Sequence, residues 1–109
     1  MENKETISKE FLAKARGFLR ITEDDDVINA EIETHIKACR MDLIRNGITS
    51  KKANSMEDSL IESAIFLYLK AEFGLDNKNY DKFRSSYETL RTELSLTDSY
   101  VSEVSDNVE

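Results

Sequence analysis

The sequence predicts an all-α protein, a small bundle of about four helices around a central apolar helix at residues 60–74. Two observations predict this fold class. The 109 residues contain no proline, so the commonest helix interrupter is missing. Apolar residues recur at helical spacing in separate stretches, and the stretch 64–69 carries no charge at all. A helix without a charged side has no face to turn toward water, so it is expected at the centre of the bundle.

Composition and length indicate one globular domain. The chain is 39% hydrophobic and 34% charged, a balance typical of folded rather than disordered proteins. We expect a single helical domain at residues 1–96 and a flexible acidic tail at residues 97–109. One cysteine excludes an internal disulfide framework, and no secretion signal is recognisable. These features predict a protein of the reducing cytoplasm.

The charge is unevenly distributed. Residues 97–109 carry four acids and no Lys or Arg, which gives −4 of the net charge of −7 and leaves a mildly acidic body. Nonspecific binding to nucleic acid depends on Lys and Arg that displace counterions from phosphates. The sequence therefore argues against such binding.

Two amphipathic helices are expected in the first half of the chain. Ser8 is a candidate N-cap for a short helix, and Thr22 with Asp25 has the spacing of a capping box for a longer one. Gly47 supplies the left-handed residue that commonly follows a helix.

The acidic run Asp24, Asp25 and Asp26 is interpreted as part of this second helix start, where the helix dipole favours carboxylates. A calcium loop counted from Asp24 would place Asn29 where glycine is needed and His35 where the bidentate glutamate belongs. We therefore favour the cap.

His35 and Cys39 have the i,i+4 spacing of a metal pair on one helix face. The chain has no further Cys or His, so a zinc site would need carboxylates or a second subunit. A buried thiol beside a half-exposed imidazole is the favoured interpretation, and no metal or cofactor is predicted.

Residues 48–54 are expected to form a loop in the one locally basic segment, which contains Arg45, Lys51 and Lys52. A solvated loop tip is one explanation. Contact with an acidic surface of a neighbouring molecule is the other.

Two further helices follow. Ser55 and Asp58 repeat the capping-box spacing before the central helix, which Gly74 closes. The last helix has a coiled-coil seam over two heptads, formed by Tyr80, Phe83, Tyr87, Leu90 and Leu94. Its partner is expected to be the central helix of the same chain, with another subunit as the alternative. Beyond it, Tyr100 is an isolated apolar anchor that could order on a partner surface.

Sequence motifs for catalysis are missing. The chain has three glycines, no phosphate-binding loop and no nucleophile elbow. The carboxylates concentrate at helix starts and solvent faces rather than in a tuned acid and base pair. We therefore expect a protein that acts through its surfaces and not as an enzyme.

Most of the chain, residues 11–100, resembles the head-tail connector proteins of tailed phages. The resemblance rests on three stretches: FLAKARGFLRITEDDDVINAEIETHIKAC, AIFLYLKAEFGLDN and FRSSYETLRTELSLTDSY. It implies a structural subunit of the virion at the head-tail junction, made in the bacterial cytoplasm, that assembles on the portal after DNA packaging. By family analogy the subunits form a ring of about twelve copies, which extends the DNA channel and docks a stopper or tail protein.

The candidate contacts between subunits or with the portal are Arg45, Lys51, Lys52, Asp24, Asp25, Asp26 and Tyr100. Charge complementarity predicts that the basic segment of one subunit meets the acidic run of the next. The alternative function is a small acidic helical regulator that occupies the basic site of a nucleic-acid-binding partner. No membrane contact is expected.

Overall fold

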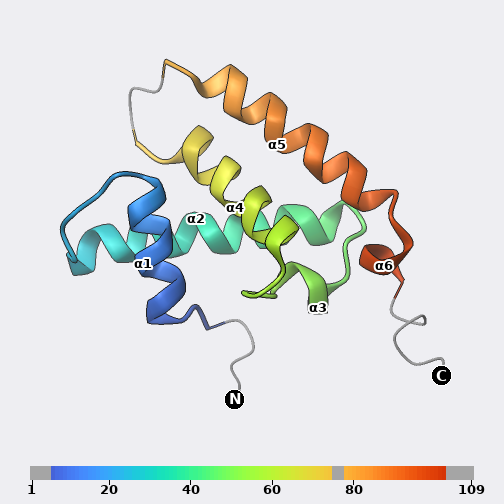
Figure 1. The fold of residues 1–109 in the computed structure, drawn as a ribbon, viewed down its shortest axis with the longest axis horizontal. Helices are drawn as coiled ribbons and strands as arrows, with labels where there is room; N and C mark the ends of the chain where they lie inside the picture. The colour runs from blue at the N-terminus through green and yellow to red at the C-terminus, as the bar shows by residue number, and fades with distance from the viewer. Residues whose placement is uncertain (1–5, 75–77, 103–109) are drawn as a thin grey trace.

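The computed structural model describes residues 6–74 and 78–102, and these residues form an all-α fold as the sequence predicts (Figure 1). Within the described ranges there are six helices and no strand. The four longer ones are α1 (Lys9–Phe18), α2 (Asp26–Arg45), α4 (Ser59–Glu72) and α5 (Tyr80–Ser95). Two helices of about one turn complete the set, α3 (Ser50–Ala53) and α6 (Asp98–Val101).

Helix α4 is the centre of the bundle, which confirms the prediction for residues 60–74. It packs against α1, α2 and α5, and Figure 1 shows it crossing α2 with α1 and α5 on either side. Its side chains Ile61, Ile65 and Leu69 are fully buried. Burial of each such side chain contributes roughly 1.5–3 kcal/mol.

The seam of α5 lies on α4 of the same chain, as predicted. Tyr87 and Leu94 are buried along it, and the Tyr87 ring meets Tyr68 of α4 edge-on, with the centroids 5.2 Å apart. Tyr80, the first position of the seam, remains 40% exposed. The close packing therefore occupies the later part of the seam.

The predicted cap of α1 is confirmed, because the Ser8 hydroxyl accepts a 3.0 Å hydrogen bond from the Phe11 amide. The predicted cap of α2 was wrong. Helix α2 begins at Asp26, and the Asp25 carboxylate accepts a 3.0 Å bond from the Ile28 amide. Aspartate is at least as good an N-cap as threonine, so the residue next to the helix takes the role that was assigned to Thr22.

Helix α4 shows a similar shift along the chain. Asp58 is its N-cap and accepts hydrogen bonds from the amides of Leu60 and Ile61. The Ser55 hydroxyl instead accepts from the amides of Glu57 and Asp58, which shapes the turn before the helix.

The glycines predicted to follow α2 and α4 have positive φ, 103° at Gly47 and 96° at Gly74. After α2 the Ile48 amide donates to the Leu43 carbonyl and the Gly47 amide to the Ile44 carbonyl. This is a Schellman motif, which turns the chain sharply from α2 into the basic segment.

Two segments are more ordered than the sequence predicts. The expected loop at residues 48–54 contains α3, whose N-cap Thr49 accepts from the Lys52 amide. Helix α6 continues the folded part to Val101, beyond the predicted boundary at residue 96. The rest of the predicted tail, residues 103–109, lies outside the described residues.

Candidate functional site

The two charged segments predicted to mediate contacts lie at opposite ends of α2 (Figure 1). Asp26 is the first residue of this helix and Arg45 the last. At a rise of 1.5 Å per residue these ends are about 28 Å apart. The acidic run and the basic segment therefore cannot pair within one chain, although a second copy can bring them together.

At the acidic end, two of the three aspartates have structural partners. Asp25 caps α2. Asp24 accepts a 2.7 Å hydrogen bond from the Asn29 amide group, and its carboxylate lies 3.5 Å from the Arg16 guanidinium. Asp26 is exposed and forms no ion pair with another described residue. The described residues contain no group of three Asp, Glu, His or Cys suited to a metal ion.

Val27 stands directly beside Asp26 and is 74% exposed. An exposed valine on the first turn of a helix gains nothing from burial and has a low helix propensity. Helix α2 therefore leaves this apolar side chain in solvent.

At the basic end, the three predicted residues differ in accessibility. The Arg45 side chain is 75% exposed and lies 3.9 Å from Asp42 of the preceding turn. Lys51 is also exposed. Lys52 points inward, with its ammonium 3.9 Å from Asp58 and 5.0 Å from the centre of the Tyr100 ring. Arg45 and Lys51 are thus the outward-facing cations of this segment.

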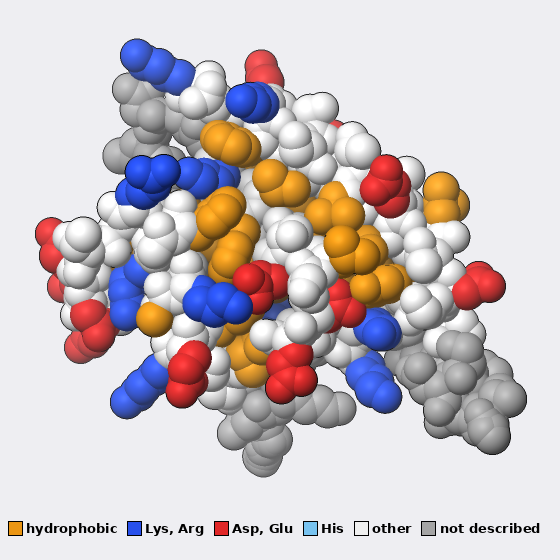
Figure 2. Space-filling view, viewed as in Figure 1, with side chains coloured by type: hydrophobic (Ala, Val, Ile, Leu, Met, Phe, Trp, Pro, Cys, Tyr) orange, Lys and Arg blue, Asp and Glu red, His pale blue; other side chains and the backbone are white. Residues whose placement is uncertain are grey.

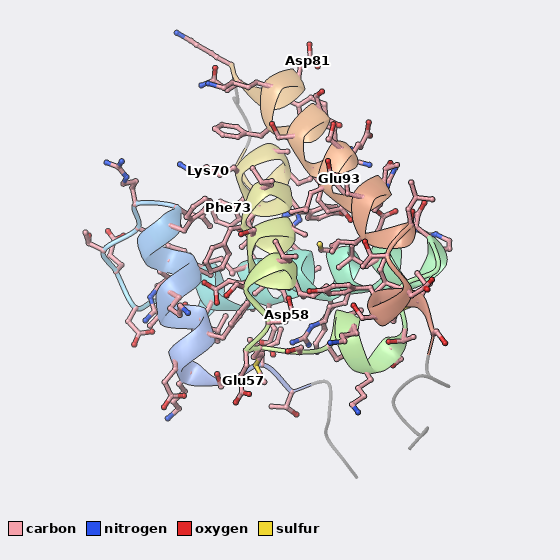
Figure 3. The ribbon with its side chains drawn as sticks, turned by 45° about the vertical axis from the view of Figure 1, so that its right-hand side comes forward. Glu57, Asp58, Lys70, Phe73, Asp81 and Glu93 are labelled. Atoms are coloured by element: carbon pink, nitrogen blue, oxygen red, sulfur yellow. The ribbon has the colours of Figure 1, made fainter. Side chains whose placement is uncertain are left out.

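Tyr100, the predicted anchor for a partner, is held by its own chain. Its hydroxyl donates to both carboxylate oxygens of Asp58, at 3.0 and 2.9 Å, and its carbonyl accepts a 2.8 Å bond from the Thr49 amide. Figure 3 shows Asp58 at the start of α4, beside α3 and α6. Burial and the bond to Asp58 raise the pKa of Tyr100 to about 12.

A pocket of about 240 Å³ adjoins the basic segment. It is lined by Lys37, Arg40, Met41, Ile44 and Asn54. Arg40 forms its inner wall, buried to 2% exposure, with a 3.4 Å hydrogen bond to the Asn54 carbonyl. Met41 is 58% exposed at its margin. Sequence reasoning missed this pocket because it depends on how the segment after α3 returns past α2.

An apolar surface lies over α4 and α5, where Figure 2 shows hydrophobic side chains gathered in a band. Leu60 of α4 and Phe18 of α1 are 46% and 37% exposed. The Lys70 ammonium lies 5.1 Å from the centre of the Phe18 ring and 5.7 Å from that of Phe83. This lysine thereby links α1 to α5 across the central helix.

Sequence reasoning also missed a polar cluster between α2 and α5. Asp42 accepts a 2.6 Å hydrogen bond from the Tyr87 hydroxyl and a 2.8 Å bond from the Arg91 guanidinium. Burial by itself would raise the pKa of Asp42, but these donors outweigh it and lower the pKa below its ordinary value. The cluster fixes α5 on α2.

The favoured interpretation of His35 and Cys39 agrees with the structure. Cys39 is fully buried, which raises the pKa of its thiol to about 12, and its sulfur lies 3.8 Å from the Tyr87 hydroxyl. His35 is partly buried and meets Phe73 edge-on. Both side chains pack the bundle.

Comparison with known protein families decides the class of this protein. The model of a family described as phage connector protein matches residues 11–101, which is most of the chain. The chain belongs to the phage connector protein family. No match was found among curated proteins or solved structures.

Membership makes this connector chain a structural component of a phage virion and a partner of other phage assembly proteins. In the described part of the connector, no helix has the length and apolar character needed to cross a membrane.

Proposed function

We propose that this chain is a head-tail connector subunit that forms a ring of about twelve copies below the portal, in head completion after DNA packaging. The ring extends the DNA channel and docks the stopper or tail protein beneath it. The observation that carries the proposal is the family match over residues 11–101. This match favours the connector role over the alternative, a small acidic helical regulator.

The distribution of charge supports the proposal. A ring of identical subunits needs a heterologous interface, in which one face of each copy meets a different face of the next. Helix α2 carries exposed Asp26 at one end and exposed Arg45 at the other, with Lys51 nearby in the sequence. Opposite charges on two separate surfaces favour head-to-tail contact and disfavour contact between like surfaces.

The net charge of −7 supports a channel that DNA passes through without sequence-specific binding. A protein that grips phosphates with many Lys and Arg would retain the DNA. A mildly acidic wall allows the DNA to move during packaging and ejection.

The role is tested by electron microscopy of lysates from the phage with this gene deleted. We expect heads and tails that remain separate, with heads that have lost their DNA. Complementation with the full chain should restore joined virions. Normal numbers of infectious virions without the gene would exclude the connector role and direct attention to a basic protein partner.

The α2 pairing has its own test, charge reversal by Arg45→Glu together with Lys51→Glu. Both side chains are exposed, so the fold should persist. We expect joined virions to become scarce and to return when Glu23→Lys, a change at another exposed acid of the same end, is added. A matched control is Lys82→Glu on α5, which is exposed and distant in sequence from both surfaces. Joined virions in normal numbers after the double reversal would remove this pairing.

A further inference from the structure

The pocket beside the basic segment is lined by both apolar and positively charged side chains. Met41 and Ile44 supply the apolar surface and Lys37 and Arg40 supply the charge, and none of the described residues that line it is acidic. At about 240 Å³ it has room for one aliphatic side chain. Its occupant should therefore be an apolar side chain with acidic neighbours.

Val27 at the opposite end of α2 has this chemistry. It is 74% exposed, it follows Asp26 directly, and Glu23 is a second exposed acid four positions earlier. Neither acid forms an ion pair with another described residue. An apolar side chain with charged neighbours is the usual composition of an interface, which has an apolar centre and a polar rim.

Within one molecule, Val27 cannot reach the pocket. Fourteen residues separate it from Met41 on a continuous helix, a distance of about 21 Å. At 100° per residue, Val27 also lies roughly a quarter turn around α2 from Lys37 and Ile44. The two surfaces face different directions, so a contact between them joins copies head to tail and does not close on itself as a symmetric pair.

We infer that Val27 of one subunit inserts into the pocket lined by Met41 and Ile44 of the next, with Asp26 facing Lys37. The inference rests on the proposed function and names the apolar centre of its subunit interface. The contact lies next to the two charged segments already proposed to meet, because Ile44 of the pocket precedes Arg45 in the sequence and Val27 follows the acidic run.

A disulfide test in the virion examines this contact directly. We would introduce Val27→Cys with Met41→Cys into the phage gene, purify the particles, oxidise them and separate the proteins without reductant. The native Cys39 is fully buried and should not react. We expect a ladder of covalent oligomers that extends beyond the dimer, because every subunit then has one thiol at each interface.

The matched control is Val27→Cys with Ala38→Cys. Ala38 is exposed on α2 but does not line the pocket. Each single variant and the control pair should give no species larger than a dimer. A ladder of equal strength in the control pair would show that chance collisions produce it, and would overturn the inference.

The remaining outcomes also decide the matter. Virions that contain the double variant only as monomer would overturn the inference, as expected if a phosphate or another protein occupied the pocket. A limit at the dimer would show a symmetric contact and would also overturn it. Absence of the wild-type chain from virions would instead contradict the proposed function, so the two failures are distinguishable.

A charge exchange gives a second readout without cysteine. Asp26→Lys or Lys37→Glu alone places like charges together, and each should lower the yield of infectious particles by about tenfold or more. The double exchange should restore most of the yield, since opposite charges face each other again. Failure of the double variant to recover, with both single variants folded, would show that these residues do not meet.

Discussion

The Tyr87 hydroxyl donates a 2.6 Å hydrogen bond to Asp42, two residues that are 45 positions apart in the chain. Tyr87 is fully buried on α5, and the same carboxylate oxygen of α2 accepts from Arg91. The bond therefore lies where the long helix carrying both proposed contact surfaces meets the last long helix of the bundle.

Tyr87→Phe should destabilise the protein, because it removes a buried donor to a carboxylate while keeping the aromatic ring. We expect a loss of about 1.5–3 kcal/mol in the free energy of unfolding. Urea denaturation followed by circular dichroism measures this loss. The control is Tyr80→Phe, the same change at an exposed position. Equal losses in the two variants would show that the hydrogen bond to Asp42 adds no more to the free energy of unfolding than an exposed tyrosine hydroxyl does.

Asp42 should make stability depend on acidic pH. Its pKa is lower in the folded chain than the ordinary value of about 3.9, so folding favours the carboxylate. The resulting stabilisation is complete above the unfolded pKa and is lost as the pH falls through the folded pKa. Urea denaturation at a series of pH values below about 5 should show a shallower decline for Asp42→Asn than for the wild type. The exposed Glu93→Gln variant should follow the wild type.

Tyr100 should respond at the opposite end of the pH scale. Its pKa in the folded chain is raised to about 12. The stabilisation from its bond to Asp58 is therefore fully present below the unfolded pKa of about 10 and is lost as the pH rises through 12. The difference between the ultraviolet titration curves of the wild type and the Tyr100→Phe variant should isolate this ionisation. A midpoint near that of an ordinary tyrosine would contradict the bond to Asp58.

Removal of residues 103–109 should separate folding from docking. We propose that this acidic segment contacts the portal, and the contacts that hold α6 lie before it. The truncated chain should unfold at the same urea concentration as the full chain but bind the portal more weakly in co-sedimentation. Truncation before Thr97 is the comparison, because it also removes Tyr100. Unchanged portal binding by the shorter deletion would exclude the segment as a contact.

Regular spacing made the long helices predictable. The seam on α5 places Tyr87 and Leu94 on one side, and the uncharged stretch of α4 requires burial wherever the helix packs. Gly47 and Gly74 also identified where two helices end, since positive φ strongly favours glycine.

The choice between two possible capping residues could not be predicted from spacing, and neither could contacts between residues far apart in the chain. Thr22 and Asp25 can each cap a helix, and only the path of the chain before α2 decides between them. Helix α3 is too short to show a period. The contact between Tyr100 and Asp58 joins side chains 42 positions apart, and no spacing rule indicates such a pair.

The candidate site was predictable in its charges and not in its shape. The sequence shows that Asp26 and Arg45 have opposite signs, but Lys52 could be recognised as inward-facing only in the folded chain. The pocket between α2 and the segment that follows α3 likewise exists only in three dimensions.

The hydrogen bonds between Tyr100 and Asp58, at the start of α4, can form only late in the synthesis of the chain. Asp58 leaves the ribosome well before Tyr100, so the nascent bundle must first hold α4 with the Asp58 cap and the neighbouring helices alone. Helix α6 can dock only when translation has passed residue 101. Docking of α6 is therefore a late step, and a chain stalled before residue 101 would lack the hydrogen bonds that join α6 to the start of α4.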